Sequence, residues 1–181
     1  MDICRRAVLR TARLRLRPVT EQDAQAVIAG VGRLHVSRWL SVVPHPYGPA
    51  DFARYLQLAV PGRHWAIEDG QGHAGGISLD PDLGFWIAPE RQGRGYAAEA
   101  ARAVIACHFD DPAAGPLRSG FYCDNHASRA VHRRLGFRST GMQEVFCQAL
   151  GQPRALLWQR LDLRDWQAAS PPPAADDLRT A

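Results

Sequence analysis

The sequence reads Gln92-Gly93-Arg94-Gly95-Tyr96-Ala97 where an expected strand gives way to a helix. The two glycines allow a tight turn and leave backbone N–H groups unobstructed, so that the turn and the helix N-terminus together can hold a pyrophosphate. Arg91 and Arg94 add positive charge. A tight turn without any ligand has the same composition, so the loop alone is a weak signal.

Two well-known phosphate loops fit this stretch poorly. A P-loop requires Gly-Lys-Ser/Thr, and the chain has no lysine. A dinucleotide fingerprint has its first glycine close to the strand end, whereas residues 88–92 intervene here and Ala98 stands where the third glycine is expected. The residues therefore argue against both of these loops.

Hydrophobic periodicity predicts a mixed α/β fold around this loop. Helices are expected at residues 21–28, 51–59, 96–109 and 125–135, and strands at 13–18, 64–68, 74–79, 83–87, 117–123, 145–148 and 155–163. Strand-helix-strand crossovers require a parallel pair of strands, while the early hairpin is antiparallel. We thus expect a central, mixed, mostly antiparallel, twisted sheet flanked by helices.

Length and composition predict one domain. The 181 residues are 46% hydrophobic and 22% charged, the balance of a folded globular protein. Residues 1–166 are assigned to this domain. Residues 167–181 form a proline-rich tail that is low in apolar residues and is expected to be disordered.

Charge and cysteine usage argue against several classes of partner. The net charge of +4 comes from arginines spread along the chain, so we expect no nucleic-acid partner. No apolar run reaches the roughly 20 residues of a membrane span, so we expect a cytoplasmic protein with no membrane partner. The four cysteines lack metal-binding spacing, and we expect no metal and reduced thiols.

Several motifs in order resemble the GNAT superfamily of acyltransferases. Its pattern Gln/Arg-x-x-Gly-x-Gly/Ala is matched by Gln92, Gly95 and Ala97. The resemblance extends over about residues 11–165, and within the superfamily these residues are similar to the RimJ/RimL branch. It is carried by Thr11-Ala12-Arg13-Leu14-Arg15-Leu16-Arg17-Pro18, Asp23, Pro46-Tyr47, Gly75-Gly76, Gly84-Phe85-Trp86-Ile87-Ala88-Pro89, Glu99-Ala100, Asn125, Ser128 and Leu135-Gly136-Phe137.

The resemblance implies acetyl-CoA as cofactor and an N-acetyltransferase that moves the acetyl group to a primary amine by direct attack on the thioester. The backbone N–H of Ile87 is expected to meet the thioester oxygen. The implied cofactor contacts are Ile87, Ala88, Arg91, Gln92, Gly93, Arg94, Gly95, Tyr96, Ala97, Asn125 and Ser128.

The part of the resemblance that contains Asn125 and Ser128 has two interpretations. Asn125 caps a helix, and Ser128 and His132 follow on one face, which is expected to look into a cleft. In the alternative, Asn125 only caps the helix and His132 lies at the surface. The resemblance leaves the acid that protonates the thiolate open: the family tyrosine is replaced by His132, while the RimJ/RimL branch relies on the serine, here Ser128.

Removal of a proton from the amine needs a base. Asp82 is the first candidate because it stands where relatives often carry glutamate, and it would act through a water. Glu68 and Asp80 are alternative bases. The alternative for Asp82 is that it serves only as a turn residue in Asp80-Pro81-Asp82.

The acceptor remains open between a protein N-terminal α-amine and a small-molecule amine. Five aromatic residues are candidates for its pocket, although each also suits the core: Trp39, Tyr47, Phe85, Trp86 and Tyr122. The alternative function is a non-catalytic, CoA-binding sensor or interaction module. Assembly into a homodimer is a further open expectation.

Overall fold

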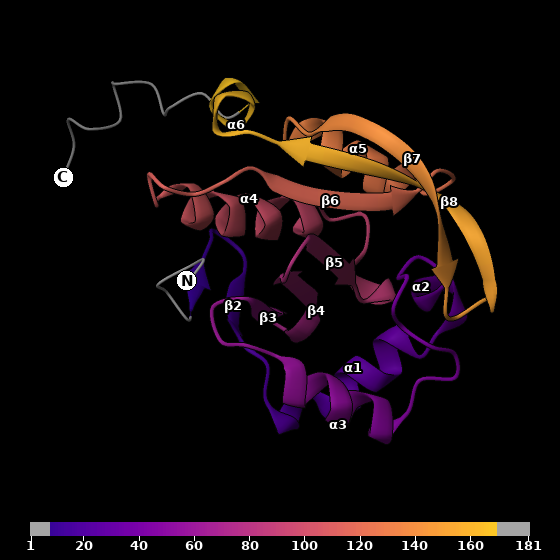
Figure 1. Ribbon diagram of the computed structural model, residues 1–181. Helices are drawn as coiled ribbons and strands as arrows, with labels where there is room; N and C mark the ends of the chain where they lie inside the picture. The colour runs from indigo at the N-terminus through magenta and orange to yellow at the C-terminus, as the bar shows by residue number, and fades with distance from the viewer. Residues whose placement is uncertain (1–7, 170–181) are drawn as a thin grey trace.

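The computed structural model describes residues 8–169, which form an eight-stranded sheet with helices on both faces (Figure 1). The strand order is β1-β2-β3-β4-β5-β6-β8-β7. Neighbouring strands are antiparallel except β5 and β6, which are parallel. The expected mixed α/β fold is therefore confirmed.

The first half of the chain contains more elements than the sequence predicted. The new ones are β1 and α2, and the strand expected from residue 13 begins at Arg15 because Thr11 and Leu14 form a turn (Thr11 N to Leu14 O, 2.9 Å). The elements are β1 (Leu9–Arg10), β2 (Arg15–Pro18), the 3-10 turn η1 (Glu21–Asp23), α1 (Ala24–Val31), α2 (Leu34–Ser37), α3 (Pro49–Leu58), β3 (His64–Asp69), β4 (Gly72–Leu79) and β5 (Leu83–Ile87).

In the second half, the helices expected at residues 96–109 and 125–135 agree with the structure, whereas the last strands differ and the helix at 163–169 was not predicted. The expected strand 145–148 is part of a much longer strand whose exposed residues give no readable alternation. The elements are the 3-10 turn η2 (Pro89–Arg91), α4 (Tyr96–Phe109), β6 (Leu117–Tyr122), α5 (His126–Arg134), β7 (Arg138–Cys147), β8 (Gln152–Leu161) and α6 (Leu163–Ala169).

The last helix, α6, extends three residues past the boundary expected for the tail. Residues 167–169 belong to α6, which is held by Trp166 against the main core and by an Arg138–Asp165 ion pair of 2.6 Å. The rest of the predicted tail, 170–181, lies outside the described residues.

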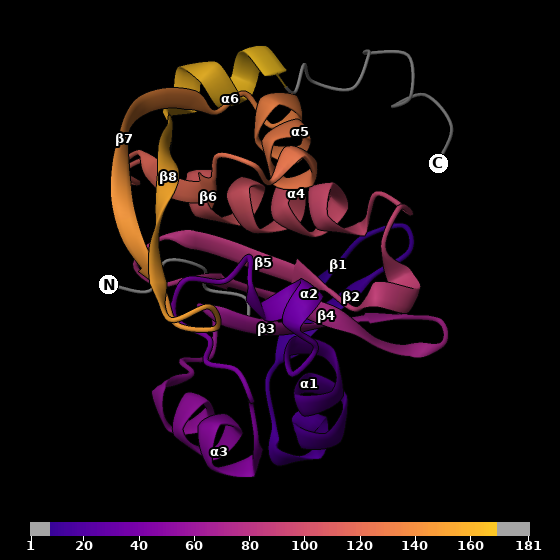
Figure 2. The same cartoon turned by 90° about the vertical axis from the view of Figure 1, so that its right-hand side faces the viewer.

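Two layers of helices enclose the first half of the sheet. Figure 2 shows α1 and α3 on one side of β2–β5 and α4 on the other. The main core lies between the sheet and α4, where Leu16, Ile67, Ala101 and Val104 are fully buried. Within residues 8–169, no helix is long and apolar enough to cross a membrane.

The sheet opens between its two parallel strands. β5 and β6 pair only at Leu83 and Ser119, and the Ser119 hydroxyl donates a hydrogen bond of 2.6 Å to the Leu83 carbonyl oxygen. Beyond this point the strands diverge, and the loop 92–95 with the N-terminus of α4 follows the end of β5.

Candidate active site

A cleft of about 750 Å³ lies at the divergence of β5 and β6. Most of the predicted site residues line it, although they come from distant parts of the chain. The predicted residues on its wall are Trp39, Tyr47, Asp82, Phe85, Trp86, Ile87, Arg91, Gln92, Gly93, Gly95, Tyr96, Ala97, Asn125, Ser128 and His132. Ala88, Arg94 and Tyr122 do not line it.

The loop before α4 has the backbone that its glycines suggest. Gly93 and Gly95 have φ values of +76° and +80°, a left-handed conformation that side-chain-bearing residues rarely adopt. Gln92 ties the loop to β5, because its Nε2 donates to the Ile87 carbonyl oxygen at 3.0 Å. The free N–H groups at the start of α4 thus face the cleft at a fixed position.

The two arginines of the loop differ in their settings. Arg91 is held by the β3–β4 turn: its Nε lies 3.1 Å from the Asp69 carboxylate, and its Nη1 donates to Gln71 Oε1 at 2.9 Å. Arg94 is exposed and donates to the Glu90 carbonyl oxygen at 3.2 Å. Arg91 is therefore the loop arginine that is fixed at the wall of the cleft.

The edge of β5 that faces β6 carries an open backbone amide. The Ala88 N–H donates to the Ala74 carbonyl oxygen of β4 at 2.9 Å. Since backbone groups alternate sides along an antiparallel strand, the Ile87 N–H points the other way, toward β6. No β5–β6 pairing reaches this residue, so the amide faces the cleft.

The start of α5 forms the opposite wall. Asn125 caps the helix, with its Oδ1 accepting a hydrogen bond of 3.0 Å from the Ser128 N–H. Ser128 is half-buried and lines the cleft. The capping prediction is confirmed, and the serine hydroxyl lies where a ligand in the cleft can reach it.

His132 does not present an open polar ring to the cleft, as the helical face had suggested. Its side chain is only 2% exposed, and the ring contacts Phe85, Phe121 and Phe137. Its Nδ1 lies 2.8 Å from the Ser128 carbonyl oxygen and its Nε2 lies 2.7 Å from the Ser119 hydroxyl. The hydrogen bond from Nδ1 to Ser128, one turn earlier in α5, leaves Nε2 facing Ser119 of β6.

The hydrogen bonds of His132 define its protonation. A carbonyl oxygen only accepts, so Nδ1 carries a proton and Nε2 is an acceptor in the neutral ring. Burial lowers the pKa of His132, which favours this neutral form. The Ser119 hydroxyl can then donate either to His132 or to the Leu83 carbonyl oxygen.

The candidate bases are all ion-paired. Asp82 lines the cleft and receives two hydrogen bonds from Arg118, at 2.6 and 2.9 Å. Asp80 lines the cleft and pairs with Arg63 at 3.3 Å. Glu68 pairs with Arg15 and Arg17 and lies outside the cleft lining, so it is poorly placed for a substrate.

The predicted aromatic residues divide between cleft and core. The Trp86 ring packs directly against Gly30 and Gly76. A Cβ at either glycine would collide with the ring. Tyr122 is 1% exposed and packs beneath the Arg154 guanidinium, 4.1 Å from its ring centroid, so it is a core residue and not part of the pocket wall. The same Arg154 contacts Trp39 at 4.9 Å.

Sequence reasoning missed three residues near the cleft. Tyr55 of α3 lines it and also packs against the apolar cluster of α1 and α2. Arg134, at the end of α5, lines the opposite end and is exposed. Ser119 contacts His132, and this contact between β6 and α5 is not visible in the spacing of the sequence.

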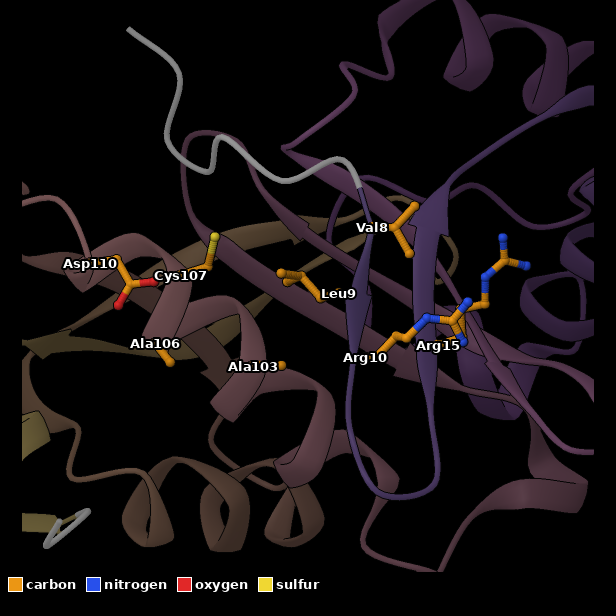
Figure 3. Close-up of a pocket in the computed structure, with 8 residues that line it drawn as sticks. All are labelled: Val8, Leu9, Arg10, Arg15, Ala103, Ala106, Cys107 and Asp110. Carbon is orange, nitrogen blue, oxygen red and sulfur yellow. The ribbon is translucent and has the colours of Figure 1, made fainter. Parts of the chain in front are cut away.

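A second hollow, of about 690 Å³, lies between β1 and α4 (Figure 3). We assign it no role because it borders the point where the described residues begin. Cys107 on its wall is disulfide-bonded, which corrects the expectation of reduced thiols at this position, whereas Cys123 and Cys147 are free. Residues 8–169 contain no group of three or more His, Cys, Asp or Glu that could hold a metal ion.

A sheet opened between two parallel strands, with a glycine loop and a helix N-terminus at the opening, is the architecture of an acetyltransferase domain. Residues 13–138 match the model of the acetyltransferase (GNAT) domain, and the chain belongs to this family. Solved structures with the same fold include RimJ and RimL acetyltransferases.

The relatives include the uncharacterized N-acetyltransferase YoaA of Bacillus subtilis (strain 168). It is 25% identical over 161 residues, covering 81% of this chain and 91% of YoaA. RimJ of Mycobacterium smegmatis, solved with a CoA disulfide, has a TM-score of 0.71 at 21% identity and covers 87% of both chains. RimL, a ribosomal L7/L12 α-N-protein acetyltransferase solved with coenzyme A, has a TM-score of 0.69 at 18% identity and covers 84% of this chain and 96% of its own.

Proposed function

We propose that this protein is an acetyl-CoA-dependent N-acetyltransferase that transfers the acetyl group to a primary amine by direct attack on the thioester. The observation that carries the proposal is the open Ile87 amide beside the glycine loop. A thioester carbonyl at this edge of β5 would receive a hydrogen bond from Ile87 while the pyrophosphate of the cofactor rests on the loop and the start of α4. Membership of the GNAT family and the CoA complexes among its neighbours support this cofactor.

Transfer requires a neutral amine, a stabilised oxyanion and a protonated sulfur. The amine nitrogen bonds to the carbonyl carbon, the oxyanion is held by the Ile87 N–H, and the C–S bond then breaks. The amine loses one proton and the departing thiolate gains one, so the products are an amide and the free thiol of CoA. No acyl-enzyme intermediate is needed in this sequence.

Ser128 is the proposed donor to the departing sulfur. Its hydroxyl belongs to the cleft wall, whereas the His132 ring is enclosed and its Nδ1 proton is used by the Ser128 carbonyl oxygen. Burial also lowers the pKa of His132, which removes the imidazolium that an acid would need. We assign His132 the role of positioning residue, because it holds the backbone of Ser128.

Asp82 is the proposed acceptor of the amine proton, through a water. Both of its oxygens are engaged by Arg118, so a proton that arrives must weaken one of these two contacts. This arrangement suits an amine that is mostly in its neutral form when it is bound in the cleft. An ammonium that stays fully hydrated would be a poor substrate.

Release of free thiol from acetyl-CoA in the presence of an amine panel tests this function. The variant Gly95→Val is expected to abolish CoA binding, because residue 95 has a φ of +80° and a bulky side chain there is strained. Calorimetric titration measures the affinity, and the melting temperature shows that the variant is folded. Unchanged CoA affinity in a folded Gly95→Val protein would remove the cofactor assignment.

A non-catalytic CoA-binding module is the second candidate. It is favoured by the engaged state of both His132 and Asp82, neither of which is free to exchange protons without rearrangement. CoA binding without thiol release with any amine would select this function.

A further inference from the structure

The end of the cleft away from the glycine loop has a distinct chemistry. We call it the acceptor end and define it by Trp39, Leu40, Val42, Val43, Tyr47 and Tyr55, which line it. Leu40, Val43, Tyr47 and Tyr55 pack with the buried valines of α1 and α2 in one apolar cluster. An amine that enters here must bring a body that tolerates an apolar wall.

The carboxylates on the cleft wall are already paired with arginines. Among the described residues that line the whole cleft, the carboxylates are Asp80 and Asp82. Asp80 pairs with Arg63 at 3.3 Å and Asp82 with Arg118 at 2.6 Å. A substrate with several ammonium groups would therefore find no unpaired carboxylate on the described part of the cleft wall, and charges buried there would lose hydration without compensation.

Two hydroxyl groups supply the polarity of this end. Burial raises the pKa of both Tyr47 and Tyr55 to about 12, so both remain neutral phenols at physiological pH. A neutral phenol can accept a hydrogen bond from one amine or donate one to a peptide carbonyl, which fits a ligand with few polar groups.

We propose that the acceptor is a primary amine carried on a bulky apolar or aromatic group, and not a polyamine or an aminoglycoside. The inference rests on the proposed acetyl transfer and names its substrate class. The apolar wall serves the chemistry as well as the binding. Removing water from an ammonium favours the neutral amine, which is the nucleophile, so the body that fits the wall also arrives in the reactive form.

This amine chemistry has two sources, a free arylalkylamine and a peptide that begins with an apolar residue. Thiol release is measured for both at saturating acetyl-CoA and constant pH. The probes are phenethylamine against putrescine and spermidine, and a peptide with N-terminal Phe against one with N-terminal Asp. We expect kcat/KM for phenethylamine to exceed that for putrescine by about 10-fold or more, since burial of even a single methylene discriminates by about 10- to 200-fold.

A carboxylate added at the acceptor end gives a second test of the substrate class. Val42 lines the acceptor end and is 83% exposed, so Val42→Asp introduces a free carboxylate with little effect on folding. It should lower kcat/KM for phenethylamine and raise it for putrescine, each several-fold. Leu58→Asp is the matched control, because Leu58 is 66% exposed and lies outside the cleft lining, and it should change neither value.

The outcomes separate the two levels of the proposal. Preference for phenethylamine or the Phe peptide, with the opposite shifts in Val42→Asp, supports the substrate class and identifies its source. Preference for putrescine or spermidine, or a Val42→Asp variant identical to Leu58→Asp, overturns the substrate class while acetyl transfer stands. Absence of thiol release with every amine in a protein that binds CoA overturns the proposed function and this inference with it.

Discussion

The His132 ring donates from Nδ1 to the carbonyl oxygen of Ser128, at 2.8 Å, one helical turn earlier in α5. The serine hydroxyl lies on the cleft wall and the ring lies beneath it, 2% exposed. The two residues that compete for the role of acid are thus a pair in which one holds the backbone of the other.

Substitution of this pair should separate the two roles. Ser128→Ala should lower kcat by about 10² or more if the hydroxyl delivers the proton to sulfur. His132→Asn keeps a donor near the Ser128 carbonyl oxygen and should retain most of the turnover, with a pH–rate profile like that of the native protein. Steady-state kinetics over pH 6–9, with CoA affinity as control, test this. A normal rate in Ser128→Ala together with a folded, inactive His132→Asn would assign the acid to His132.

Acid should destabilise the fold through the histidines whose pKa the fold lowers. Burial lowers the pKa of His132, and also that of His64 and His73, from the ordinary value of 6.5. The unfolded chain therefore binds more protons, so the stability contribution is present above about pH 6.5 and decreases as the pH falls below it. Each such group adds a slope of up to about 1.4 kcal/mol per pH unit. The lowered pKa values of Asp23 and Glu99 act in a more acidic range, below their ordinary values of 3.8 and 4.5.

Denaturant unfolding between pH 7.5 and 5 measures this dependence. The free energy of unfolding should fall steadily below pH 6.5 in the native protein and less steeply in His132→Asn. Equal slopes for the two proteins would show that His132 is not held neutral by the fold.

Arg134 is expected to contact the 3′-phosphate end of CoA. It is exposed, lines the cleft beside α4, and follows the cofactor-facing residues of α5, whereas the neighbouring Arg133 does not line the cleft. Arg134→Ala should weaken CoA by about 3- to 10-fold, because a charge-assisted contact at an exposed site is modest. Titration with CoA and with dephospho-CoA tests this, and Arg133→Ala is the matched control. Equal losses for both ligands would place Arg134 away from the 3′-phosphate.

Gly76 should control the shape of the cleft wall through Trp86. A Cβ at residue 76 would lie 2.6 Å from Trp86 Nε1, so Gly76→Ala must displace the indole ring. We expect a loss of about 1–3 kcal/mol in stability and a higher KM for the amine, with CoA affinity preserved. Gly84→Ala is the control on the adjacent strand, because its Cβ would meet only the Ser78 hydroxyl oxygen, at an ordinary 3.6 Å. Unfolding curves and amine kinetics would contradict the prediction if the two variants behaved alike.

The sequence by itself determined the parts of this protein that depend on neighbouring residues. Gly93 and Gly95 define the turn before α4, and Asn125 caps α5, because backbone freedom and capping act over three or four residues. The hairpin of β3 and β4 and the boundaries of β5 and α4 were predictable for the same reason.

Only the tertiary structure decided the state of the site. Arg118 reaches Asp82 across 36 residues, and Ser119 reaches His132 only because β6 passes over the inner side of α5. Helical spacing had suggested an open polar face for His132, but burial is decided by the strands and aromatic rings that pack against that face. Charge pairing and desolvation depend on contacts between distant segments, and the local pattern of the chain carries no record of them.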